Sequence, residues 1–132
     1  MKVNLTKTKE NNMKVFVYRN LTKKCFSIMA LEGERKGRVI AHRMFVDLTD
    51  AVFKVREAGR QRVLKTGQKN VHAGVVGQWS DTLNSILTPV TTPVRYNPKV
   101  SGDFTTEDGA PIKRAKFVEL SGGKYIFAGG IE

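Results

Sequence analysis

The residues best suited to chemistry lie in a basic stretch near the middle of the chain, within residues 51–77. It holds one acid, Glu57, among the basic residues Arg56, Arg60, Arg62, Lys65 and Lys69. Guanidinium and ammonium groups bind phosphate through charge-assisted hydrogen bonds. On a helical wheel Arg62, Lys65 and Lys69 share one face, so they are the main phosphate-binding candidates. Arg56 and Arg60 fall on the face with Val63, where they pair with Glu57, extend along the surface or line a groove.

Further polar residues extend this candidate site. Asn70 and His72 directly follow the basic stretch and would add hydrogen bonds, while Lys23 and Lys24 lie at the tip of a predicted hairpin. A solvated turn is the alternative reading of the two lysines. The predicted nucleic-acid-binding residues are Lys23, Lys24, Arg56, Arg60, Arg62, Lys65, Lys69, Asn70 and His72.

Catalysis has little support in the sequence. His42 and His72 are the two histidines, and a histidine pair can cleave RNA by acid–base chemistry. Each falls on a predicted strand without a third supporting group, and Cys25 is the single cysteine. No metal-ligand spacing, phosphate-loop pattern or nucleophile motif is present. We therefore predict no catalytic residue, no metal and no cofactor.

The distribution of charge indicates the class of partner. The formal net charge is +11, and the excess lies in the first 69 residues, because residues 70–132 contain equal numbers of basic and acidic groups. A localised excess favours a polyanion such as DNA or RNA over a general role in solubility. Without a recognisable base-reading module, the expected binding is directed at phosphates and sensitive to salt.

The elements that must position these residues are mainly strands. Alternating apolar residues predict strands at residues 13–19, 25–31, 38–46 and 51–56, joined by short turns that include residues 47–50. We expect these strands to form an antiparallel meander. The basic stretch forms a short helix or turn, followed by a strand from Val71 to Val76.

The second half of the chain is predicted to complete the sheet. Residues 78–87 have the pattern of a short helix, in which Trp79 covers the core or serves as an exposed platform. A short extended segment at residues 91–96 follows, and then a turn-rich surface loop or loose hairpin at 97–114. The glycines after Ser121 predict a hairpin of residues 116–120 and 124–127. The expected fold class is α+β and β-rich: an antiparallel meander or small barrel-like sheet with one or two short helices.

The domain organisation is simple. Residues 13–132 have the size and composition of a single globular domain, and residues 1–12 form a flexible basic arm. No apolar run is long enough for a membrane span and no secretory signal is present, so we expect a cytoplasmic protein.

Four stretches carry a resemblance to a known group: residues 17–21 (VYRNL), 56–64 (REAGRQRVL), 69–74 (KNVHAG) and 95–98 (RYNP). They make the chain similar to small uncharacterised accessory proteins of tailed bacteriophages and prophages. The resemblance implies a protein that acts in the cytoplasm of an infected bacterium. It also implies an alternative function, inhibition of a host or anti-phage defence complex by protein binding, in the manner of an anti-CRISPR protein.

Three functions thus remain open. The first is binding of nucleic acid or a ribonucleoprotein through the basic residues. The second is inhibition of a host or defence protein, and the third is a ribonuclease that uses His42 and His72. The oligomeric state is open as well.

Overall fold

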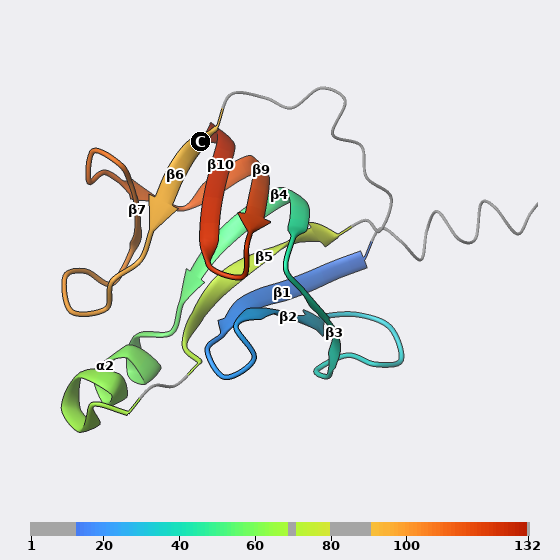
Figure 1. The fold of residues 1–132 in the computed structure, drawn as a ribbon, viewed down its shortest axis with the longest axis horizontal. Helices are drawn as coiled ribbons and strands as arrows, with labels where there is room; N and C mark the ends of the chain where they lie inside the picture. Colours follow the sequence, from blue (N-terminus) through green and yellow to red (C-terminus); the bar gives the residue numbers. More distant parts are fainter. Residues whose placement is uncertain (1–12, 69–70, 80–90, 132) are drawn as a thin grey trace, which may run out of the picture.

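The computed structural model describes residues 13–68, 71–79 and 91–131. These residues form one sheet and one helix, α2 (Glu57–Thr66) (Figure 1). The strands are β1 (Met13–Asn20), β2 (Cys25–Ala30), β3 (Val39–Arg43), β4 (Val46–Val55), β5 (Ala73–Trp79), β6 (Thr92–Arg95), β7 (Phe104–Thr106), β8 (Pro111–Ile112), β9 (Arg114–Ser121) and β10 (Tyr125–Ile131).

All the strand pairs of the sheet are antiparallel, and their order is β3-β2-β1-β5-β4-β9-β10-β6-β7-β8. Over the described residues the pairing ends at β3 on one side and at β8 on the other. The sheet is therefore open over these residues, and the barrel-like alternative of the sequence prediction is not shown. The β-rich antiparallel class is confirmed.

Two predicted hairpins are confirmed. β1 and β2 pair from Val15 opposite Ala30 to Asn20 opposite Cys25, and β9 pairs with β10 across the turn at Gly122 and Gly123. Both follow from alternating apolar residues bounded by turn residues.

The predicted turn at residues 47–50 is wrong. β4 runs through it as one strand, and the register shifts between Thr49 and Val52 around Asp50, whose φ is 50°. A left-handed residue within a strand produces a β-bulge, which aspartate tolerates better than most residues. The turn-like residues therefore mark a bulge.

The predicted meander also fails at its fourth strand. β4 does not pair with β3; β5 lies between β1 and β4 and pairs with both. The helix predicted at residues 78–87 begins instead as strand, because Gln78 and Trp79 belong to β5, and its remaining residues lie outside the described ones.

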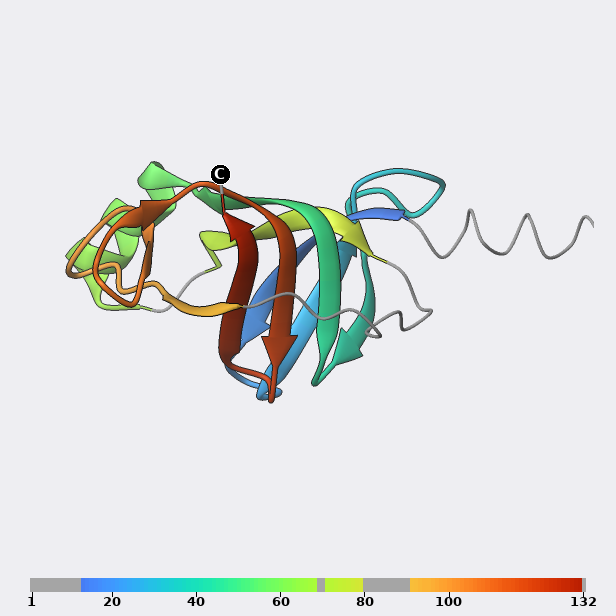
Figure 2. The same ribbon diagram turned by 90° about the horizontal axis from the view of Figure 1, so that it is seen from above.

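The sheet bends so that its two halves enclose one core. Figure 2 shows β9 and β10 in front of β1 and β2. Inward residues of both halves are buried in a single cluster, which includes Val15, Val17, Phe26, Ile28, Leu48, Phe53, Val75, Val118 and Leu120.

At one end of this core the turns of the two halves touch. The amide nitrogen of Gly123 donates to the carbonyl oxygen of Met44 at 3.1 Å. A Cβ at Gly123 would lie 2.5 Å from the carbonyl oxygen of Lys24. The turn between β9 and β10 is thus packed against the turn between β1 and β2, an approach that only glycine permits.

Candidate nucleic-acid interface

Helix α2 carries Arg60, Arg62 and Lys65 of the predicted site, and its inner side packs against residue 72 of the sheet. Gly59, the buried residue of the helix, packs so closely that a Cβ there would lie 2.6 Å from the Cβ of His72. Arg56 precedes the helix; its backbone nitrogen donates to the carbonyl oxygen of His72 at 2.7 Å and its Nη2 to that of Val71 at 2.9 Å. The helix is therefore anchored at its N-terminal end.

Arg60 adds a second anchor. Its Nε donates to the carbonyl oxygen of Pro98 at 2.9 Å, and its Nη1 lies 2.9 Å from a carboxylate oxygen of Glu57. The Arg60 side chain is 17% exposed. Of the alternatives for Arg60, pairing with Glu57 is the one observed, so this guanidinium joins the helix to the loop after β6.

The side chain of Glu57 contacts other residues of α2. It accepts a hydrogen bond from the Gln61 side chain at 2.6 Å and pairs with Arg60. These contacts, Gln61 first, lower the pKa of the Glu57 carboxyl below its ordinary value. The single acid of the basic stretch is thus already neutralised by its neighbours on α2.

The outer side of α2 is cationic. Arg62 and Lys65 are exposed, and the ion pairs between described residues are Arg60–Glu57 and Lys113–Asp103 alone. Lys54, exposed near the end of β4, adds a cation that is not among the predicted site residues. Arg62, Lys65 and Lys54 are termed the helix group below; Lys69 and Asn70 lie outside the described residues.

His72 supports the helix rather than facing solvent. It is 8% exposed, and its Nε2 lies 2.6 Å from the hydroxyl oxygen of Tyr96. Burial raises the pKa of the Tyr96 hydroxyl, which therefore stays protonated at neutral pH. Tyr96 in turn stacks on Phe104 at 5.0 Å between ring centroids. This buried contact directs the imidazole away from an incoming ligand.

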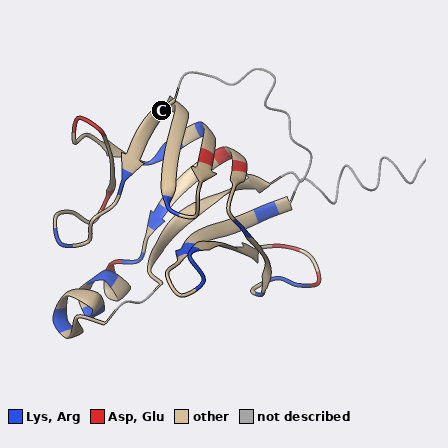
Figure 3. Cartoon of the chain, in the orientation of Figure 1, with Lys and Arg blue, Asp and Glu red and all other residues tan. Residues whose placement is uncertain are grey.

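Lys23 and Lys24 form a second, separate group. They are exposed on the turn between β1 and β2 and, through the packing of Gly123 on Lys24, share that end of the core with Lys124. Figures 1 and 3 show this turn apart from α2. Lys23, Lys24 and Lys124 are termed the turn group.

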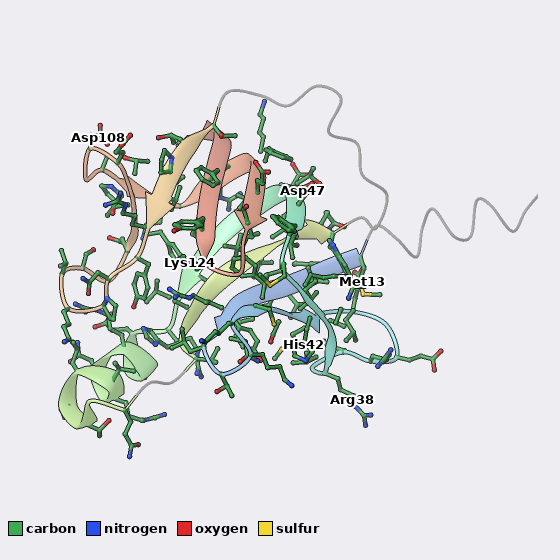
Figure 4. The ribbon with its side chains drawn as sticks, in the orientation of Figure 1. Met13, Arg38, His42, Asp47, Asp108 and Lys124 are labelled. Atoms are coloured by element: carbon green, nitrogen blue, oxygen red, sulfur yellow. The ribbon has the colours of Figure 1, made fainter. Side chains whose placement is uncertain are left out.

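The two histidines also lie in separate clusters. His42, labelled on β3 in Figure 4, has its Nδ1 3.1 Å from the hydroxyl oxygen of Ser27, which is fully buried. His72 belongs to the contact with Tyr96.

Within residues 13–68, 71–79 and 91–131, no three His, Cys, Asp or Glu side chains gather in a way that would hold a metal ion. The single described helix is too short and too polar to cross a membrane.

An acidic pair lies at the opposite end of β4 from Lys54. Asp47 and Glu119 are directly opposite each other on β4 and β9. Burial, and secondly the charge of Glu119, raise the pKa of the Asp47 carboxyl above its ordinary value of 3.8. The outer face of the sheet is therefore acidic at one end of β4 and basic at the other (Figure 3).

We expect Asp47→Asn to stabilise the fold at neutral pH by about 0.5 kcal/mol, because it removes a charge that is partly buried and that is repelled by Glu119 on the opposite strand. A raised folded-state pKa means that Asp47 favours folding only while protonated, so its contribution is lost as pH rises from 3.8 through the raised value. Urea unfolding at pH 7 and pH 3 should show the difference between the variants at pH 7 and none at pH 3.

Asp108 provides the control of opposite sign. Hydrogen bonds from the Thr106 hydroxyl and the Ala110 backbone lower the pKa of its carboxyl. Asp108→Asn should therefore destabilise the protein at pH 7. An Asp47→Asn variant that is also less stable at pH 7 would contradict the assignment of repulsion to the Asp47–Glu119 pair.

Comparisons with known proteins agree on one family. A sequence model described as Mycobacterium phage L5 gene 82 protein matches residues 8–128. The gene 82 protein of Mycobacterium phage L5 is 39% identical over 116 residues, which cover 83% of this chain and 90% of that protein. No solved structure matches. The resemblance to bacteriophage proteins is confirmed.

Proposed function

This chain belongs to the family of the Mycobacterium phage L5 gene 82 protein, and from that premise we propose that it is a phage accessory protein that binds nucleic acid or a ribonucleoprotein. Binding occurs largely through phosphate contacts made by the helix group, in the cytoplasm of an infected bacterium. We assign no catalytic step to it.

The proposal depends on the different roles of the two sides of α2. Gly59, Arg56 and Arg60 fix the inner side of the helix to the sheet, while Arg62 and Lys65 point cations outward without an acidic partner among the described residues. A fixed helix that presents unpaired cations is suited to phosphate, because its backbone loses little conformational freedom on binding.

We expect the double substitution Arg62→Gln and Lys65→Gln to weaken binding of a DNA or RNA oligonucleotide by roughly 10- to 100-fold at about 0.1 M salt. The slope of log K against log salt concentration should fall by about two, because two phosphate contacts are lost. Fluorescence anisotropy titrations over a range of salt concentrations would measure both.

Arg35→Gln with Lys36→Gln is the matched control. These residues are exposed on the loop between β2 and β3, so the variant loses the same charge elsewhere. Equal losses of affinity in the two double variants would show that net charge alone drives binding and would overturn the role of α2.

A second candidate function is protein binding, as expected of an inhibitor of a host or defence complex. It is favoured by the turn group, which lies beside exposed apolar side chains: Met44 is 47%, Phe45 68% and Tyr125 54% exposed. Exposed aromatic and methionine side chains are typical of protein interfaces. Binding of a bacterial protein that survives nuclease treatment and is lost on Phe45→Ser would favour this function over the first.

The ribonuclease alternative has the weakest support. His42 contacts Ser27 and His72 contacts Tyr96, in separate clusters. If RNA cleavage is measured, it should persist after both histidines are changed to alanine.

A further inference from the structure

The outer face of the sheet next to α2 combines aromatic rings with a cation. This face is the one opposite the buried Val15, Val17, Phe53 and Val75. Lys54 of β4 is directly opposite Gly74 of β5. The register of β1 and β5, in which Val17 is opposite Val75, places Tyr18 opposite Gly74 when it is continued by one residue. Tyr18, Gly74 and Lys54 therefore form one row across three strands.

Gly74 makes room in this row for an aromatic ring of the neighbouring strand. It has no side chain, and the ring of Phe16 occupies the space beside it: a Cβ at Gly74 would lie 2.6 Å from ring atoms of Phe16. Phe16 and Tyr18 lie side by side, with centroids 5.8 Å apart and planes inclined by 31°. Both side chains are partly exposed. Two neighbouring aromatic rings are thus held at the surface of a central strand.

Apolar side chains continue the same face. Phe16 is opposite Val76, which is opposite Val52, and both valines are partly exposed. The outer face beside α2 therefore carries an apolar strip flanked by Lys54. Strands hold such a strip more rigidly than loops do, so its rings are fixed before a ligand arrives.

Basic side chains predominate at this end of the sheet, where Glu57 is paired with Arg60 and Asp103 with Lys113. Lys54 is exposed on the same face as the rings, and α2, which carries Arg62 and Lys65, follows β4. The acids of β4, Asp47 and Asp50, lie in its first half, and Glu119 lies opposite Asp47. Figure 4 shows Asp47 at the end of the sheet remote from α2. A ligand with alternating flat apolar groups and negative charges matches this arrangement.

We propose that Phe16 and Tyr18 form a stacking surface for the bases of single-stranded nucleic acid, with Lys54 and α2 holding its phosphates. The inference rests on the proposed function and specifies its ligand as single-stranded nucleic acid. Bases of a single strand expose their π-faces and stack on aromatic side chains, whereas the faces of paired bases in a duplex are covered by their neighbours. Since every base has such a face, the binding is independent of sequence.

The test compares a fluorescent 12-nucleotide deoxythymidine strand with a 12-base-pair DNA duplex, measured by anisotropy. Wild-type protein should bind the single strand more tightly. Tyr18→Leu should weaken single-strand binding by about tenfold and leave duplex binding and the salt slope unchanged. Tyr18→Phe, which keeps the ring, should retain wild-type affinity. If Tyr18→Leu fails to fold, Phe16→Leu, which removes the neighbouring ring, should show the same selective loss of single-strand binding.

Tyr125→Leu is the matched control, because Tyr125 is a 54% exposed tyrosine beside the turn group. It should bind the single strand like wild type. Equal affinity of wild type and Tyr18→Leu for the single strand, with binding still dependent on Arg62 and Lys65, would overturn the stacking surface alone. Absence of binding to either oligonucleotide would overturn the proposed function as well.

Discussion

Replacing Gly74 by alanine should destabilise the protein by about 3 kcal/mol, because the added methyl group has no space in the sheet. A Cβ at this position would lie 2.4 Å from the carbonyl oxygen of Val17 and 2.6 Å from the ring of Phe16. The first of these neighbours is backbone of the adjacent strand, so β1 and β5 would have to move apart in the centre of the sheet. Thermal unfolding should show a fall of roughly 10 °C in Tm.

Gly33→Ala is the appropriate comparison. Gly33 has a φ of 83°, and no atom lies within 4 Å of the place that a Cβ would take, so alanine there carries only the cost of a left-handed backbone, about 1 kcal/mol. Gly74 has no positive φ, and its cost arises from space alone. Adding Phe16→Ala to Gly74→Ala should recover only part of the loss, since the carbonyl contact remains. Equal stability of Gly74→Ala and wild type would contradict the observed approach of β1 to β5.

Gly59→Ala should have the second largest effect on stability. Whether it stabilises or destabilises the protein shows whether α2 is packed on His72. In an exposed helix this substitution stabilises by about 1 kcal/mol, because alanine is the better helix former. Here the new Cβ would lie 2.6 Å from the Cβ of His72. We expect α2 to be pushed off the sheet, at a cost of about 2 kcal/mol, with loss of the Arg60 hydrogen bond to Pro98.

Hydrogen exchange of the α2 amides would detect this change directly. They should exchange faster in Gly59→Ala, while amides of β9 and β10 remain protected. Oligonucleotide binding should also weaken, although no charge has changed, because Arg62 and Lys65 are no longer held in place. Leu64→Ala, at a 40% exposed helical position, should leave both exchange and binding close to wild type. A stabilised Gly59→Ala variant would show that the helix is not packed on His72.

The strands can be predicted from sequence where the signal is local. Val15 and Val17 alternate with outward residues, and the glycines at 122 and 123 mark a tight turn, so both hairpins are expected. The strands that neighbour β4 cannot be predicted in this way, because strand order depends on contacts between distant segments. Asp50 illustrates the limit: aspartate favours turns and bulges alike, and only the continued pairing of β4 distinguishes them.

The cations of the candidate site can also be identified in the sequence. The sequence does not show which of them anchor the helix and which are free to bind a ligand. Arg60 and Arg62 are two residues apart, and only the position of Pro98 makes the first structural. The burial of His72 depends on Tyr96, 24 residues further along the chain. Residues 13–19 carry apolar groups on both faces, yet Phe16 and Tyr18 are partly exposed. Alternation gives no information on whether a second layer lies over the outer face.

The insertion of β5 between β1 and β4 also determines the order of events as the chain leaves the ribosome. The hairpin of β1 and β2 can form early, but the free edge of β1 has no partner until residue 79 has emerged. Until then the nascent chain exposes an unpaired strand edge and the apolar side chains of Val15 and Val17, the kind of surface that chaperones bind. Because the central ladder joins segments far apart in sequence, its contact order is high, and the protein should fold more slowly than a sheet of the same size built only from consecutive hairpins.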